Sequence, residues 1–343
     1  MSFGGVRCGK KVLNWNVISF PSMKTISHLI LVFTLLVIAA SCKKDDNEDS
    51  ISLGLLKIDA APGKGFLWPY YLNIHNTSKS TTLLVLPNNT GYPSNDQTVH
   101  DKAAKDLAEW GYNFAKELNI PLLVPTFPRP EGEVSDYSIA EVYTQALDRE
   151  TLETSRSGIQ RIDLQLIAMI DDAIERLSQE GIDVDSKIFI MGFSASGMFT
   201  NRFTLLHPDR VKAAAIGSPG GWPIAPIDKW EGESLRYHVG VSDVQQLTGN
   251  PFNLDLFKTI PLFFFMGDQD INDSVPFGDS YVQEDRDLVN RLFGTTPVLR
   301  WPKAEQIYEY VGCNSQFVLY PGAGHEITSA MAKDLKDFFQ EYR

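Results

Sequence analysis

The sequence predicts an α/β fold, built on a mostly parallel, doubly wound sheet with helices on both faces. Short apolar runs alternate with segments of helical periodicity from about residue 66 to residue 343. The runs are almost continuously apolar, as in strands that helices cover on both sides. Serine, aspartate and histidine residues follow three of these runs, at the strand ends where α/β folds place their binding and catalytic groups.

Each predicted element follows from its own residue pattern. Residues 66–74 form the first strand, which is expected near a sheet edge because Pro69 cannot donate a backbone hydrogen bond. A helix over residues 158–180 is indicated by Ile162 and Leu166, which share one face with other apolar residues at helical spacing. The remaining predicted elements are a helix at about residues 102–118 and strands at residues 81–86, 121–125, 187–191, 211–216, 261–266 and 316–320.

Composition narrows the classes of function. The chain is 43% hydrophobic and 22% charged, which is ordinary for a globular protein, and one domain is expected over residues 55–343. Its formal net charge of −12 argues against a nucleic-acid partner, because phosphate binding needs a basic surface. Only Cys313 of the three cysteines lies in that domain, and no histidine cluster shows ligand spacing. We therefore predict no disulfide, no metal and no cofactor.

The N-terminal segment resembles an export signal. Residues 23–41 have a basic start, a short apolar run and small residues before Cys42, as in a lipoprotein signal peptide whose cysteine receives lipid. The charged run after it resembles the tether of Bacteroidetes-type lipoproteins, so residues 42–54 are expected to be a flexible acidic tether. Translation is expected to start at Met23, which makes residues 1–22 a mis-assigned leader. The mature protein is thus expected to be exported and anchored by lipid to the bacterial outer membrane, exposed at the cell surface.

Ser194 lies at a predicted sharp turn between a strand and a helix. Such a turn presents the serine hydroxyl to a base and leaves the next backbone N–H free to bind a developing oxyanion. It requires small residues two positions either side, which here are Gly192 and Ser196, and Gly197 follows. Ser196 is the poorer nucleophile candidate, because the bulky Met198 would then occupy a flanking position.

Two later predicted strands are followed by acidic residues and by a histidine. Asp268, Asp270 and Asp273 follow the first of them, and His325 follows the second in a glycine-rich loop. In one hydrolase fold the three residues of the catalytic triad follow one another in the sequence as serine, acid and histidine, which is the order found here. Other folds with such a triad have a different order. His325 would accept the proton of Ser194, and one of the acids would hold the imidazole in the required tautomer.

These segments together resemble the α/β-hydrolase superfamily, in particular polyhydroxybutyrate-depolymerase-like and dienelactone-hydrolase-like esterases. The motifs that carry the resemblance are residues 192–197, 267–270 and 324–325. The resemblance implies the α/β-hydrolase fold, and it implies Asp270 as the triad acid because relatives place that acid last in a G-x-x-D turn. Asp273 is the alternative, since the D-x-x-P sequence that begins there also occurs in relatives.

The oxyanion hole is expected to use the Ala195 N–H and a second donor from the loop after the strand at residues 81–86. Asn89 and Thr90 are the predicted donors in that loop, which lacks the H-G-G sequence of many lipases.

The predicted activity is hydrolysis of carboxylic esters through an acyl-enzyme, on small-molecule or carbohydrate-linked substrates outside the cell. Residues 219–260 form a small insertion before the acid-bearing strand, and its Trp222 and Trp230 are predicted to line the substrate pocket. Two alternatives remain open. One is a serine peptidase or amidase with the same triad, and the other is a non-catalytic surface-binding lipoprotein on a hydrolase scaffold. Nothing in the sequence indicates an oligomeric state.

Overall fold

The structure is a computed structural model, and it describes residues 54–75, 80–132, 142–278 and 280–343. The expectations for residues 1–22, for the signal at residues 23–41, for Cys42 and for nearly all of the tether fall outside these ranges. The helices and strands of the described residues are, in chain order, β1 (Gly54–Ile58), η1 (Pro62–Lys64), β2 (Tyr70–Ile74), β3 (Ser80–Thr81), β4 (Leu84–Val85), α1 (Gln97–Leu118), β5 (Leu122–Pro125), η2 (Thr144–Ala146), α2 (Arg149–Glu153), α3 (Ile162–Gln179), β6 (Asp183–Val184), β7 (Ile188–Phe193), α4 (Ala195–Leu206), β8 (Val211–Gly217), β9 (Lys229–Trp230), β10 (Glu233–Ser234), α5 (Val244–Thr248), α6 (Leu254–Phe257), β11 (Leu262–Gly267), α7 (Gln283–Phe293), α8 (Pro297–Tyr310), β12 (Ser315–Tyr320) and α9 (Ser329–Glu341).

Within the described residues, eight strands form one mixed sheet in the order β1-β2-β5-β4-β7-β8-β11-β12. β2 runs antiparallel to both of its neighbours, whereas every pairing from β5 to β12 is parallel. The predicted fold class, a mostly parallel sheet with helices on both faces, is confirmed. Because the carboxyl ends of the parallel strands share one edge, the loops after β4, β7, β11 and β12 meet there.

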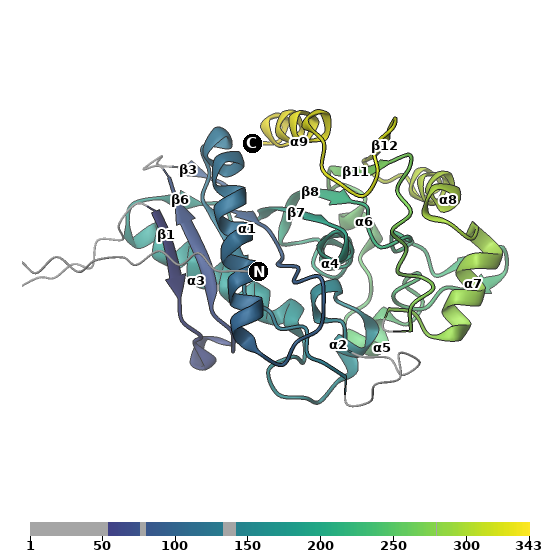
Figure 1. Cartoon of the computed structure of the whole chain (residues 1–343), viewed down its shortest axis with the longest axis horizontal. Coiled ribbons are helices and arrows are strands. Elements are labelled where there is room, and N and C mark those ends of the chain that lie inside the picture. Colours follow the sequence, from purple (N-terminus) through teal and green to yellow (C-terminus); the bar gives the residue numbers. More distant parts are fainter. Residues whose placement is uncertain (1–53, 76–79, 133–141, 279) are drawn as a thin grey trace, which may run out of the picture. The chain divides into compact units, whose positions relative to one another are not determined.

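Alternate residues of the central strands point to opposite faces of the sheet, as the two-residue period of a strand requires. In β7, Ile188 and Ile190 share a core with apolar residues of α3 and α4, whereas Phe189 and Met191 share a core with α1 and α9. Figure 1 shows the long helix α1 lying across the sheet. Both faces are therefore covered, which accounts for the nearly continuous apolar runs in the sequence.

The predicted elements differ from the observed ones mainly at their ends. The strand predicted at residues 66–74 corresponds to β2, which begins only at Tyr70, directly after Pro69, and is the second strand from the sheet edge. The predicted strand at residues 81–86 is divided, because Ser80–Thr81 pairs with β6 in a separate two-stranded sheet and only Leu84–Val85 joins the main sheet.

The insertion before β11 carries the β9–β10 hairpin, α5 and α6. Its buried side chains, Trp222, Leu235 and Val239 among them, form a core of their own with residues of α7 and α8. Among the described helices, none is both long and apolar enough to span a membrane.

Candidate active site

Ser194 connects β7 to α4 in a backbone conformation that residues with a side chain rarely adopt. Its φ is 63° and its ψ is −125°, a combination that costs on the order of 1–3 kcal/mol for a non-glycine residue. The Ser194 N–H donates to the carbonyl oxygen of Gly217 at 2.9 Å, which fixes the turn to the neighbouring strand β8. The hydroxyl group is thus held at the carboxyl edge of the sheet, where the chain reverses.

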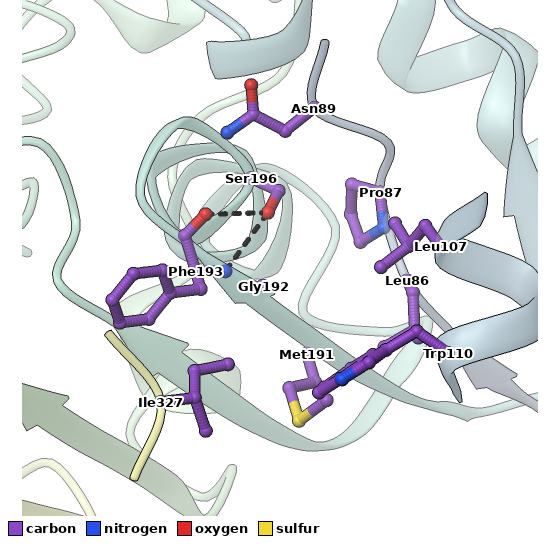
Figure 2. Close-up of a pocket in the computed structure, with 10 residues that line it drawn as sticks. All are labelled: Leu86, Pro87, Asn89, Leu107, Trp110, Met191, Gly192, Phe193, Ser196 and Ile327. Atoms are coloured by element: carbon purple, nitrogen blue, oxygen red, sulfur yellow. Dashed lines mark hydrogen bonds between the residues drawn. The ribbon is translucent and has the colours of Figure 1, made fainter. Parts of the chain in front are cut away.

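The residues around Ser194 are small because backbone atoms approach them closely. A Cβ atom at Gly192 would lie 2.0 Å from the carbonyl oxygen of Ser196, and one at Gly197 would lie 2.2 Å from that of Gly217. Ser196 Oγ donates to the Phe193 carbonyl oxygen at 2.8 Å and accepts from the Phe193 N–H at 3.0 Å, as Figure 2 shows. The Ser196 hydroxyl is therefore bound inside the turn, whereas Ser194 remains partly exposed.

His325 and Asp270 form a hydrogen-bonded pair at the same edge of the sheet. His325 Nδ1 lies 2.8 Å from Asp270 Oδ2, and Asp270 is only 1% exposed. The Asn272 N–H donates to Asp270 Oδ1 at 2.8 Å. Burial opposes ionisation of this carboxyl group, but the bonds from His325 and Asn272 outweigh it and hold the pKa of Asp270 below its usual value. Asp270 is therefore ionised at neutral pH.

The other two candidate acids have different partners. Asp273 Oδ1 accepts from Arg300 at 2.7 Å and from the Val275 N–H at 3.0 Å. Arg300 is 1% exposed, so Asp273 serves as the counter-ion of a buried cation. Asp268 Oδ1 accepts from the Gly322 N–H at 2.7 Å and joins two loops. The geometry thus favours Asp270 over both as the partner of His325.

The imidazole of His325 packs against Phe193, the residue before Ser194, with the ring centroids 4.8 Å apart. Within the described residues no hydrogen bond joins Ser194 Oγ to the imidazole, whose Nδ1 is bonded to Asp270. In free enzymes such bonds are often long and become short only when substrate is bound. The structure therefore brings His325 to the turn of the candidate nucleophile, with Asp270 behind it.

No protein-family model matches the chain, and no curated protein matches it in sequence. Poly(aspartic acid) hydrolase-1 from Sphingomonas sp. KT-1 is similar in structure, with a TM-score of 0.55 and 16% identity over 84% of this chain and 98% of that chain. A poly(3-hydroxybutyrate) depolymerase from Bordetella parapertussis gives a TM-score of 0.52 and 17% identity over 85% of this chain and 92% of that chain. The chain has the α/β-hydrolase fold.

In an α/β-hydrolase fold the oxyanion hole combines the N–H after the nucleophile with one from the loop after the strand equivalent to β4. Ala195 is the first residue of α4, and it lines a cavity of about 340 Å³ together with Ser194 and Asn89. The Thr90 N–H donates instead to Gln145 Oε1 at 2.7 Å. The prediction for Thr90 is therefore wrong, because its donor is already bonded, and Asn89 is the remaining candidate in this loop.

The cavity of about 340 Å³ that contains Ser194 has mostly polar walls. Arg129, Tyr143, Asn272 and Phe277 line it, and the Arg129 guanidinium lies 3.6 Å from the centroid of the Tyr143 ring. The sequence patterns did not single out these four residues, because they lie in loops whose course depends on tertiary packing. Among the described residues, no group of three or more His, Cys, Asp or Glu side chains could hold a metal ion.

The two tryptophans predicted to contact substrate lie elsewhere. Trp222 is 1% exposed and stacks on Phe293 of α7 with the ring centroids 3.9 Å apart. Trp230 packs edge-on against Tyr310 of α8 at 5.8 Å. Neither ring lines the cavity beside Ser194, so this prediction is wrong. Both rings attach the insertion to the body of the domain, where burial of their apolar area stabilises the fold.

Proposed function

We propose that the protein is a serine hydrolase that cleaves carboxylic esters through an acyl-enzyme intermediate. The observation that carries the proposal is the bond between buried Asp270 and His325 Nδ1, at the same edge of the sheet as the Ser194 turn. Because Asp270 holds the proton on Nδ1, His325 Nε2 is left to accept the proton of Ser194. The names of the two similar structures, a hydrolase and a depolymerase, are in keeping with this reaction class.

The proposed reaction proceeds in two balanced halves. Ser194 Oγ attacks the ester carbonyl carbon while His325 takes its proton, and the resulting oxyanion accepts hydrogen bonds from the N–H groups of Ala195 and Asn89. The intermediate then collapses, and His325 returns the proton to the departing alcohol. Water, deprotonated by His325, then attacks the acyl carbon. The bond to Ser194 Oγ breaks, His325 returns the proton to that oxygen, and the carboxylic acid is released. Asp270 stabilises the imidazolium in both halves.

The decisive experiment combines active-site labelling with turnover. A fluorophosphonate probe should label the purified protein at Ser194, and Ser194→Ala should abolish both the label and the hydrolysis of 4-nitrophenyl acetate. Ser196→Ala is the matched control and should retain both. Labelling or turnover that survives Ser194→Ala would contradict the proposal. Matched 4-nitrophenyl ester and 4-nitroanilide substrates test the amidase alternative, because the triad chemistry is common to both.

We propose in addition that the mature protein is exported and held at the outer membrane by lipid on Cys42, where it acts on small-molecule or carbohydrate-linked esters. The support is the signal-like sequence that precedes this cysteine. Cells fed a labelled fatty acid should incorporate it into the wild-type protein and not into Cys42→Ser. Equal incorporation into both proteins would refute the anchor.

A further inference from the structure

A second cavity, of about 160 Å³, lies beside the Ser194 turn on the side of α1. We call it the apolar slot, and it is lined chiefly by Leu86, Leu107, Trp110, Met191, Phe193 and Ile327. Figure 2 shows Leu107 and Trp110 on one side of it, with Met191 and Phe193 at the end of β7 and Ile327 from the loop after β12. Two of these elements, the end of β7 and the loop after β12, lead to Ser194 and carry His325, respectively.

The slot offers few polar partners to water. Its polar side chains are Asn89 and Ser196, and the Ser196 hydroxyl is already bonded to the Phe193 backbone on both its donor and acceptor sides. Cavities with such walls favour apolar guests over water. Trp110 is 51% exposed, so its ring is accessible to a ligand that enters the slot.

The slot and the polar cavity contact different residues of the same turn: Phe193 and Ser196 line the slot, whereas Ser194 lines the polar cavity. Asn89, the proposed oxyanion donor, lines both of them. Phe193 lines the slot and packs against His325, with the ring centroids 4.8 Å apart. A group that enters the slot therefore contacts residues of the nucleophile turn and the same Phe193 side chain that packs against His325.

We infer that the apolar slot binds the acyl chain of the substrate ester and that Leu107 and Trp110 determine acyl specificity. The inference rests on the proposed function. The acyl chain stays attached to Ser194 after the alcohol has left. Contacts with apolar walls would therefore stabilise the chain in both halves of the reaction. The polar cavity suits the alcohol that departs and the water that enters.

The volume of the slot sets the chain length that it accepts. An apolar cavity of about 150 Å³ in another protein binds benzene, which has six carbon atoms, so a slot of about 160 Å³ accommodates an acyl chain of about six carbons. Each methylene buried there should raise kcat/KM about fourfold, the equivalent of about 0.8 kcal/mol. Longer chains should bring no further gain.

The test compares 4-nitrophenyl esters from acetate to decanoate with the full chain and two variants. The wild type should show the rise and the plateau. Leu107→Trp fills the slot and should lower the ratio of kcat/KM for the hexanoate to kcat/KM for the acetate by about tenfold or more. Lys105→Trp is the matched control, because it adds the same ring to the exposed face of the same helix, where Lys105 pairs with Glu109. Leu107→Phe provides a smaller filling if the first variant unfolds.

Several outcomes would overturn the inference. A flat chain-length profile in the wild type would do so, as would identical profiles for Leu107→Trp and Lys105→Trp while Ser194-dependent turnover persists. A parallel series of alkyl acetates, in which only the alcohol varies, separates the two sides of the ester. An effect of Leu107→Trp on that series alone would assign the slot to the alcohol instead. Failure of the proposed function looks different, because no ester of any length would then show Ser194-dependent turnover.

Discussion

Asparagine substitutions at Asp270 and Asp273 should damage two different properties of the protein. Asp270→Asn keeps the side-chain shape but removes the negative charge that holds the His325 tautomer and stabilises the imidazolium. The corresponding loss in serine hydrolases is about 10⁴-fold in kcat, or about 5.4 kcal/mol of transition-state stabilisation. The folded state should be little affected, since an asparagine oxygen can still accept the bond from the Asn272 N–H.

Asp273→Asn should act on stability instead. It removes the counter-ion of Arg300, which is 1% exposed and 2.7 Å from Asp273 Oδ1. Leaving a buried charge without its partner costs about 3–5 kcal/mol. Arg300 keeps its bonds to the Gly294 carbonyl oxygen and to Asn290 Oδ1, so we expect the lower end, about 3 kcal/mol. For a domain of this size that corresponds to a decrease in Tm of about 6 °C.

Both variants can be measured with the same two assays. Thermal unfolding followed by circular dichroism gives Tm, and initial rates with 4-nitrophenyl acetate, taken well below Tm, give kcat and KM. The expected pattern is an inactive, stable Asp270→Asn and an active, less stable Asp273→Asn. The reverse pattern, with activity lost in a fully stable Asp273→Asn, would refute the assignment of roles.

Three further substitutions test other parts of the structure. Ser196→Ala removes both hydrogen bonds to the Phe193 backbone, so urea unfolding should show that the free energy of unfolding is lower by about 1–2 kcal/mol, while most ester turnover remains. Loss of turnover without loss of stability would contradict the turn geometry. Burial holds the pKa of His238 well below its usual range, so the unfolded state binds a proton below about pH 6.5 that the native state does not. Protonation of His238 in the unfolded state should therefore lower the unfolding free energy by about 2 kcal/mol between pH 7.5 and pH 5. His238→Phe should not show this decrease. If the unfolding free energies of both proteins depended equally on pH, that would argue against a buried neutral imidazole. Trp222→Ala should lower the unfolding free energy by about 3–5 kcal/mol without changing KM. A raised KM in the folded variant would indicate that Trp222 contacts the substrate after all.

Local sequence patterns were sufficient to predict most of the fold. The apolar run 187–191 became β7 and the periodic segment 158–180 became α3, because each pattern reports directly on burial against the sheet. The turn at Ser194 could also be predicted, since the small residues that it requires lie within three positions of it. Each of these features is determined by residues that are close to one another in the sequence.

The errors arose where partners are distant in the chain. Thr90 was a reasonable oxyanion donor until the fold placed Gln145, 55 residues away, against its N–H. The resemblance already implied Asp270 over Asp273, but the reason that Asp273 has another partner, Arg300, lies 27 residues later in the chain. Trp222 was expected at the substrate, but the packing of the insertion on α7 buries it. Tertiary contacts decided each case.

The backbone conformation at Ser194 has a consequence for any attempt to improve this protein by selection. Glycine adopts a φ near 63° without the clash of a Cβ atom, so Ser194→Gly should be more heat-resistant than the natural chain. That substitution also removes the candidate nucleophile. A screen that rewards thermal tolerance alone would therefore enrich inactive sequences at this position, and only a screen that also scores turnover would retain the serine.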